Sequence, residues 1–280
     1  MSFSPTPDQE AAEAPTGLFD SGVGALSVLR HVQARLPSEH LLCFCDSGHA
    51  PYGGKSDAQI IERTLAIADF LLQKKVKAIV VACNTATAAA IEALRQHHPE
   101  LIVVGVEPGL KPAAVFSKSG IGGVLATAST LASSRFIALR DHITSSTGVR
   151  FLTQACVGLV EQIEKGELES PETVAMLERY VMPILRGGAD TIALGCTHYP
   201  FVQPAIEAIA QREGADPITI IDTGEAVSRQ LERLLQQRGL QRFETRPGSL
   251  QAFTTGSEAQ LEHAFSVLLQ QSPPITAVTA

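Results

Sequence analysis

The sequence contains no tryptophan, and aromatic residues make up only 5% of its 280 residues. Surfaces that stack nucleic-acid bases need such side chains. The net charge is −7 and the 22 Lys and Arg residues are scattered, so the basic footprint of a nucleic-acid-binding protein is missing. No apolar run approaches the roughly 18 residues of a membrane span, and the opening segment lacks the basic and apolar regions of a secretory signal. We therefore expect neither a nucleic-acid-binding nor a membrane protein.

The five cysteines are an odd number, and no C-x-x-C motif is present. Because disulfide frameworks and dithiol redox sites use paired or closely spaced cysteines, we expect reduced thiols and a cytoplasmic location. Hydrophobic residues make up 45% of the chain and charged residues only 18%, which excludes an intrinsically disordered protein. The thiols are therefore candidates for chemistry other than disulfide formation.

Short apolar runs alternate with longer segments of helical periodicity. The segment from 56 to 72 combines i, i+3, i+4 apolar spacing with a capping box of Ser56 and Gln59. Strand–helix alternation at this spacing predicts parallel sheets and the α/β class. Residues 1–15 are expected to form a flexible N-terminal arm and 272–280 a frayed tail. Strands are expected at 16–19, 41–45, 78–82, 101–106, 121–126, 149–153, 191–195 and 218–221.

The expected strands form two sets of four whose ends match in order, 107 to 115 residues apart. We infer two similar α/β domains, each with a mostly parallel sheet flanked by helices, related by a pseudo-twofold axis. Ligands bind at the carboxyl ends of such strands, so the active site is expected in the cleft between the domains, with Cys83 and Cys196 on opposite walls. The paired ends are Asp20 and Thr127, Asp46 and Cys156, Cys83 and Cys196, and Glu107 and Asp222.

Cys83 and Cys196 each stand where a strand meets the start of a helix, and the partial positive charge there favours a thiolate. Two thiols on opposite sides of a substrate suit proton transfer at a carbon stereocentre. One group removes the α-proton from one face, and the other delivers a proton to the opposite face. Asp20 and His198 are candidate helpers. Taken singly, Asp20 is equally consistent with a helix N-cap, and His198 with a structural histidine.

Six motifs carry a resemblance to a known family. They are FDSGVGALSV (19–28), APYGGKS (50–56), VVACNTATAAA (80–90), GVEPGLKPAA (105–114), LGCTHYP (194–200) and IDTGEAV (221–227). Taken together and in this order, they resemble the glutamate racemases of the aspartate/glutamate racemase family. The resemblance implies a discontinuous first domain, with residues 16–108 and 223–280 in the first domain and 109–222 in the second.

The resemblance also implies roles for individual residues. Cys83 and Cys196 correspond to the two catalytic acid/base thiols, with Cys196 acting on the L-enantiomer and Cys83 on the D-enantiomer. Asp20 corresponds to the residue that assists Cys83, and His198 with Glu164 to the groups that assist Cys196. The residues that the resemblance assigns to substrate binding are Asp20, Ser21, Pro51, Tyr52, Gly53, Asn84, Thr85, Thr130, Thr197 and His198.

The family resemblance extends to cofactors and partners. Members use no pyridoxal phosphate, no metal and no nucleotide cofactor, so none is expected here. The implied reaction is racemisation of L-glutamate to D-glutamate for peptidoglycan synthesis, and hence for cell-wall formation and cell shape, by a homodimer. Some longer members need UDP-N-acetylmuramoyl-alanine for activity, which makes this cell-wall precursor a candidate activator.

Several other interpretations stay open from the residues alone. GVGALS (22–27), with Asp46 beyond it, resembles the start of a dinucleotide-binding fingerprint but lacks the third glycine. Cys43 with Cys45, or Cys196 with His198, could point the same way toward a metal, although no third and fourth ligands cluster with either pair. A protein that binds an amino acid without converting it is a third alternative. An aspartate racemase that uses the same two-thiol chemistry is a fourth.

Overall fold

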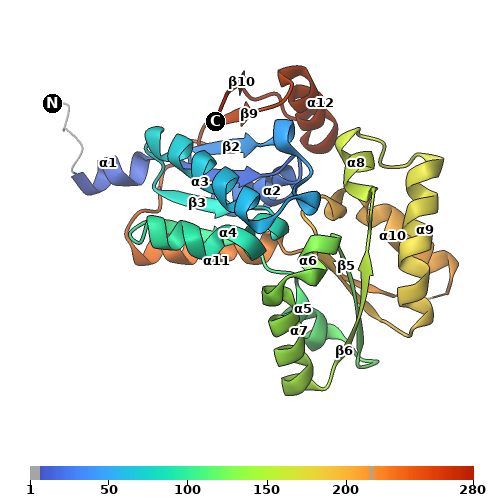
Figure 1. Ribbon diagram of the computed structural model, residues 1–280. Helices are drawn as coiled ribbons and strands as arrows, with labels where there is room; N and C mark the ends of the chain where they lie inside the picture. The colour runs from blue at the N-terminus through green and yellow to red at the C-terminus, as the bar shows by residue number, and fades with distance from the viewer. Residues whose placement is uncertain (1–6, 215–216) are drawn as a thin grey trace. The chain divides into compact units, whose positions relative to one another are not determined.

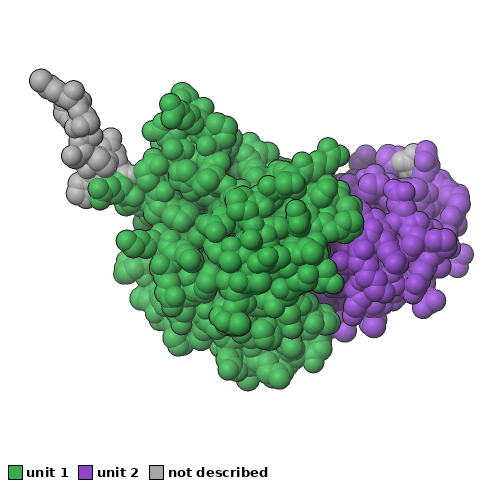
Figure 2. Space-filling view, turned by 90° about the horizontal axis from the view of Figure 1, so that it is seen from above, with its two compact units in different colours: residues 1–106, 224–280 green, residues 107–223 purple. Residues whose placement is uncertain are grey.

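The computed structural model describes residues 7–214 and 217–280. The chain divides into two compact units, one formed by residues 1–106 and 224–280 and the other by residues 107–223 (Figure 2). Each unit is built on one parallel sheet with helices packed around it (Figure 1). The predicted α/β class, with two similar units that contain parallel sheets, is confirmed.

The sheet of the first unit has the strand order β10-β9-β2-β1-β3-β4, with every neighbouring pair parallel. Strand β1 pairs with β2 on one side and with β3 on the other, so the strands that follow β1 in the sequence lie on opposite sides of it. Open α/β sheets bind ligands beside the carboxyl ends of the strands at such a switch point. The strands are β1 (Thr16–Asp20), β2 (Leu41–Cys45), β3 (Ala78–Val81), β4 (Ile102–Gly105), β9 (Leu250–Thr254) and β10 (Ile275–Ala277).

Helices pack on the first sheet in pairs: α2 lies against α11, and α3 lies against α4 (Figure 1). Phe19, Phe44 and Ile79 from the strands form one buried cluster with Leu71 of α3 and Ile91 of α4. Burying each such side chain contributes about 1.5–3 kcal/mol, and this burial holds the strand ends in place. The bounds are α2 (Ala25–Arg35), α3 (Asp57–Gln73), α4 (Asn84–His97), α11 (Gly224–Gln237) and α12 (Glu258–Leu269), with the 3-10 helices η1 (Ser47–His49) and η2 (Tyr52–Gly54).

The sheet of the second unit has the order β6-β5-β7-β8, again all parallel. This order repeats β2-β1-β3-β4 of the first unit, which agrees with the internal repeat expected from the strand ends. Strands β5 and β7 therefore correspond to β1 and β3. The strands are β5 (Ile121–Ala126), β6 (Arg150–Ala155), β7 (Thr191–Gly195) and β8 (Thr219–Ile221).

Helices of the second unit also pack in pairs, with α5 against α7 and α9 against α10. The core under α5 and α7 contains Leu110, Val124, Phe136 and Ile221. The bounds are α5 (Leu110–Phe116), α6 (Ala128–Ala132), α7 (Ser134–Thr147), α8 (Leu159–Glu164), α9 (Pro171–Arg186), η3 (Tyr199–Val202) and α10 (Gln203–Arg212). In the described part of the chain, no helix has both the length and the apolar character needed to cross a membrane.

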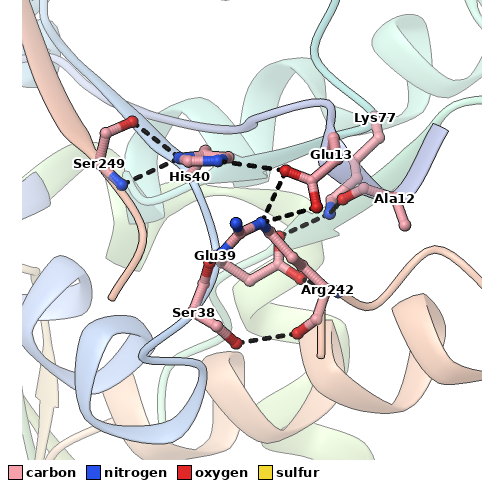
Figure 3. A network of polar contacts seen from close by, with 8 residues as sticks. All are labelled: Ala12, Glu13, Ser38, Glu39, His40, Lys77, Arg242 and Ser249. Atoms are coloured by element: carbon pink, nitrogen blue, oxygen red, sulfur yellow. Dashed lines mark hydrogen bonds and ion pairs between the residues drawn. The ribbon is translucent and has the colours of Figure 1, made fainter. Parts of the chain in front are cut away.

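The structure differs from the expected flexible arm at residues 7–13, which form helix α1 (Pro7–Glu13); residues 1–6 lie outside the described residues. A polar network fastens the end of this helix to the first unit (Figure 3). The Lys77 Nζ donates to the Ala12 carbonyl at 2.6 Å and forms an ion pair with Glu39 at the same distance. The Arg242 Nε lies 2.9 Å from a Glu13 oxygen. Long-range partners, rather than local periodicity, therefore order this segment.

The expected frayed tail is a second difference. Residues 275–277 form β10, which pairs with β9, and the Val278 N–H donates to the Thr254 carbonyl at 2.8 Å. Both strands were missed because each is short and carries a weak apolar pattern, LQAFT and ITA. The sheet itself stabilises them, since its edge supplies the hydrogen-bond partners.

Candidate active site

The first group of predicted site residues lies at the carboxyl ends of β1 and β3, which are neighbours in the sheet. Cys83 is the N-cap of α4, and its sulfur accepts a hydrogen bond from the Ala86 N–H at 3.5 Å. Asp20 ends β1, and its Oδ1 accepts hydrogen bonds from the Ser21 N–H at 2.6 Å and hydroxyl at 3.0 Å. The Ser21 Oγ is also 3.7 Å from the Cys83 Sγ, so this hydroxyl connects the carboxylate to the thiol.

Burial raises the pKa of the Cys83 thiol well above its usual value, and the negative charge of Asp20 raises it further. Hydrogen bonds from the Ala86 N–H and from Ser21 lower this pKa, but they do not offset the increase. The effect of desolvation on the Cys83 pKa thus opposes the thiolate that the helix start favours. The raised pKa favours the protonated form of the Cys83 thiol.

The second group lies at the carboxyl end of β7, with Cys196 directly after the strand. The His198 Nδ1 is 3.7 Å from the Cys196 Sγ, and the His198 Nε2 is 2.6 Å from the Glu164 Oε1. The His198 side chain is only 3% exposed and that of Glu164, at the end of α8, is 23% exposed. These three residues form a chain in which a carboxylate orients an imidazole beside a thiol.

The pKa of His198 is set by opposing effects. Burial lowers it, but the hydrogen bonds and charges of Cys196 and Glu164 raise it more, so the pKa lies well above its usual value. The imidazole therefore holds both ring protons at neutral pH, one directed to Glu164 and one to the sulfur. A neighbouring imidazolium stabilises the thiolate form of a cysteine. The two groups therefore differ in their surroundings: a buried carboxylate lies near Cys83, and an imidazole lies beside Cys196.

Asn84 gives the clearest sign of a ligand in the first unit. Its side-chain nitrogen and oxygen are both buried and have no hydrogen-bond partner among residues 7–214 and 217–280. Leaving a buried polar group unsatisfied costs about 1–3 kcal/mol, so such an amide calls for an explanation such as a missing ligand. Asn84 and Thr85, both buried, open α4 immediately after Cys83.

The segment from 50 to 53 contributes three more of the predicted binding residues. Tyr52 is buried and its hydroxyl donates to the Asp46 Oδ2 at 2.6 Å. The hydroxyl is therefore already engaged, which leaves the backbone of Tyr52 and Gly53 for a ligand. Pro51 is exposed and follows a cis peptide bond.

Thr130 and Thr197 are the remaining predicted binding residues in the second unit, and both are buried. The Thr127 side chain caps α6 by accepting from the Thr130 N–H, and its hydroxyl donates to the Thr130 Oγ1 at 2.9 Å. Thr197 lies between Cys196 and His198 in the chain. The predicted residues thus gather into one group on each unit. The cleft expected to join the two groups stays a prediction.

Two residues near Cys196 were not predicted to contribute to the site. Burial raises the pKa of Cys156 to about 12, and the adjacent hydroxyl of Tyr199 lowers it in part. The Tyr199 N–H donates to the Cys196 carbonyl at 3.1 Å, and all three residues are buried. The signal was present in the sequence, since Cys156 directly follows β6 and so lies at the same edge of the sheet as Cys196.

The structure bears on two of the alternative interpretations. The fully buried Asp46 carboxylate accepts hydrogen bonds from Tyr52, Arg63 and Thr255, so it is not positioned to hold the ribose of a dinucleotide. Cys43 and Cys45 are packed inside the sheet. Throughout the part of the chain that the structure describes, no three His, Cys, Asp or Glu residues are arranged to hold a metal ion.

The chain is similar to several known proteins. The Asp/Glu/Hydantoin racemase family matches residues 26–239. A curated glutamate racemase of Ectopseudomonas mendocina (strain ymp) is 49% identical over 258 residues, covering 92% of this chain and 95% of that protein. Glutamate racemase isoform RacE1 from Bacillus anthracis superposes with a TM-score of 0.85 at 29% identity, covering 96% and 98% of the two chains.

A further solved structure is Escherichia coli glutamate racemase in complex with L-glutamate and the activator UDP-MurNAc-Ala. It superposes with a TM-score of 0.81 at 31% identity and covers 94% of this chain and 97% of that one. The family match spans most of the chain, and the relatives cover nearly its whole length. The chain therefore belongs to the Asp/Glu/Hydantoin racemase family, among the glutamate racemases.

Proposed function

We propose that the protein interconverts L- and D-glutamate by moving protons at the α-carbon between two thiols. Cys196, as a thiolate beside His198, removes the α-proton of L-glutamate. The Cys83 thiol delivers its own proton to the opposite face, and the reverse reaction uses the same groups in exchanged states. The observation that carries the proposal is that each unit has one thiol at the equivalent point of the same strand order, with its own acidic partner.

The protonation states of the two groups support this direction of transfer. The raised pKa of Cys83 keeps a proton on the residue that must act as the acid. The raised pKa of His198 keeps a positive charge beside the residue that must act as the base. The α-proton of an amino acid is weakly acidic, and a positioned acid or base typically accelerates such a transfer by about 10²–10⁴-fold.

Binding of glutamate would satisfy the polar groups around the thiols. In this proposal the Asn84 amide hydrogen-bonds the substrate, which removes the cost of its unpartnered burial. The backbone of Tyr52 and Gly53, with Ser21, Thr85, Thr130 and Thr197, completes the polar surroundings. In the proposed reaction, side chains of the protein carry out every proton transfer, and no cofactor takes part.

The wider role follows from the relatives rather than from the site. We propose that the D-glutamate supplies peptidoglycan synthesis, and that the enzyme works in the cytoplasm as a homodimer. A reducing compartment suits the mechanism, because oxidation of either thiol would stop it. The Escherichia coli relative was solved with L-glutamate and the activator UDP-MurNAc-Ala, which makes the same precursor a candidate activator here.

Isotope exchange in D₂O tests the mechanism. With L-glutamate as substrate and no added cofactor, the first D-glutamate formed should carry deuterium at the α-carbon while the remaining L-glutamate keeps hydrogen. This pattern arises because the group that removes the proton differs from the group that delivers one. Early D-glutamate that retains the substrate hydrogen would contradict two-thiol transfer. Turnover of aspartate without turnover of glutamate would select the aspartate racemase alternative.

Substitution of the thiols completes the test. Cys83→Ala and Cys196→Ala should each reduce racemisation by at least about 10²-fold, the lower end for loss of an acid/base group. Cys43→Ala is the matched control, since it removes another buried thiol from the first sheet and should leave turnover intact. Wild-type protein that binds glutamate but never exchanges its α-proton would point to a binding protein instead.

A further inference from the structure

A buried carboxylate at the end of β2 gathers side chains from distant parts of the first unit. Asp46 is fully buried, and it accepts hydrogen bonds from the Tyr52 hydroxyl at 2.6 Å and the Thr255 hydroxyl at 2.8 Å. The Arg63 guanidinium donates to both of its oxygens, at 3.1 and 2.8 Å. The His49 Nδ1 lies 3.0 Å from the Asp46 Oδ1. Removing such charged groups from water costs free energy, so stability alone is a weak explanation for this cluster.

The cluster is charged, which makes its hydrogen bonds strong. Burial raises the pKa of Asp46, but the hydrogen bonds from Arg63, Tyr52 and Thr255 outweigh it and hold the pKa below its usual value. Hydrogen bonds to an ionised acceptor are shorter and about twice as strong as those between neutral groups. The 2.6 Å contact from Tyr52 is of this kind, so Asp46 fixes the tyrosine firmly.

Tyr52 connects the cluster to the catalytic thiol. Its ring belongs to the same buried core as Cys83, and η2, which it begins, packs against α4. The Asp46 N–H also donates to the Asp20 carbonyl at 2.9 Å, so the cluster contacts the neighbouring β1 strand end. Asp46 is therefore hydrogen-bonded to the 50–53 segment through its side chain and to the end of β1 through its backbone.

Residues beyond the end of the family match, at residue 239, also contact the cluster. Thr255 directly follows β9, and the Arg63 Nη1 donates to the Ala280 carbonyl, beyond β10. The residues that follow the last two strands of the sheet thus contact Asp46 and Arg63. These contacts give the strands at the edge of the sheet a connection to the site.

We propose that Asp46 and Arg63 are positioning residues for glutamate turnover, which hold the 50–53 segment in its binding conformation through the Tyr52 hydroxyl. The inference rests on the proposed function. Arg63 neutralises and orients Asp46, Asp46 orients Tyr52, and Tyr52 fixes the backbone that faces the substrate. Neither Asp46 nor Arg63 touches the substrate itself.

Steady-state kinetics of Tyr52→Phe tests the inference. Loss of the hydroxyl should raise KM for both enantiomers by about tenfold and leave kcat within about threefold, because it removes binding common to the ground and transition states. Tyr180→Phe is the matched control: the Tyr180 hydroxyl donates to the Val157 carbonyl at 2.5 Å in the second unit, and its loss should leave KM unchanged. If the Tyr52 hydroxyl had only a structural role, Tyr52→Phe and Tyr180→Phe would both change the melting temperature, and their KM values would not differ from each other.

Arg63→Lys is the second variant, and it tests the positioning role independently if Tyr52→Phe fails to fold. It keeps the positive charge but loses the two-pronged contact with Asp46, and KM should rise again with little change in kcat. If the folded variants have KM values within twofold of wild type, the inference is overturned. The proposed function still stands in that case, provided that the wild-type enzyme turns over glutamate. Wild-type enzyme without glutamate turnover would instead refute the proposed function and this inference with it.

Discussion

Replacing Glu164 with Gln tests the acid–base chain in the second unit most directly. The substitution keeps the size of the side chain but removes the charge 2.6 Å from the His198 Nε2. A hydrogen bond to a charged group is worth about 1.5–3 kcal/mol, and the 23% exposure of Glu164 favours the lower end. Since 1.4 kcal/mol corresponds to about tenfold in rate, kcat/KM should fall about tenfold.

The pKa of His198 determines how activity and stability should change with pH. Glu164 and Cys196 raise the pKa of His198 above its usual value, so activity that needs the imidazolium persists at neutral pH and is lost as the pH rises through that raised pKa. Without the Glu164 charge, the loss should begin at lower pH. The same linkage acts on folding, because a raised pKa stabilises the protein fully below the unfolded value of about 6.5. Glu164→Gln should therefore destabilise the fold most below that pH, and the deficit should shrink as the pH rises.

The assay is the pH profile of kcat/KM with each enantiomer, together with urea unfolding at several pH values. The equilibrium constant of racemisation is one, so kcat/KM must fall equally for L- and D-glutamate. Glu161→Gln is the control, since it removes the same charge from an exposed position of helix α8. Glu164→Gln with wild-type kcat/KM and an unshifted alkaline limb would refute the role assigned to the Glu164–His198 contact.

Two other predictions concern buried polar groups. Asn84→Ala should raise KM for glutamate about tenfold, as loss of a hydrogen bond to a charged ligand would, while the melting temperature stays the same or rises, because the amide has no partner in the described protein. Calorimetry that shows a clear loss of stability would contradict the assigned role. Lys77→Met should lower the free energy of unfolding by about 3–5 kcal/mol, since it removes the ion-pair partner of the buried Glu39 carboxylate. An unchanged urea midpoint would show that Glu39 does not need this partner.

The sequence predicted strands β1 to β8 and missed β9 and β10. Strands β1 to β8 follow from apolar runs, and the signal is clearest in TGLF and TIALG, because a strand buried on both faces carries a continuous apolar pattern. Strands β9 and β10 depend on the sheet edge for their hydrogen bonds. Helix α1 depends on Lys77 and Arg242, which are far from it in the sequence. Local pattern cannot reveal elements that distant partners stabilise.

The same limit applies to the candidate site. The resemblance pointed to His198 and Glu164, and the structure places their side chains 2.6 Å apart. The protonation of Cys83 could not be inferred from its position before a helix, because the effect of burial and of Asp20 depends on the complete fold. The cluster around Asp46 joins residues that are 6, 17 and 209 positions apart, a combination that no motif of the sequence displays.

The repeated strand order has an evolutionary consequence. In the proposed mechanism, either unit by itself would carry one of the two reacting thiols, which could exchange the α-hydrogen of one enantiomer with solvent but could not invert the centre. Duplication of a gene for such a one-thiol ancestor would supply the opposite group in a single event. The two mirror-image forms of the substrate would then be divided between the two halves of one gene.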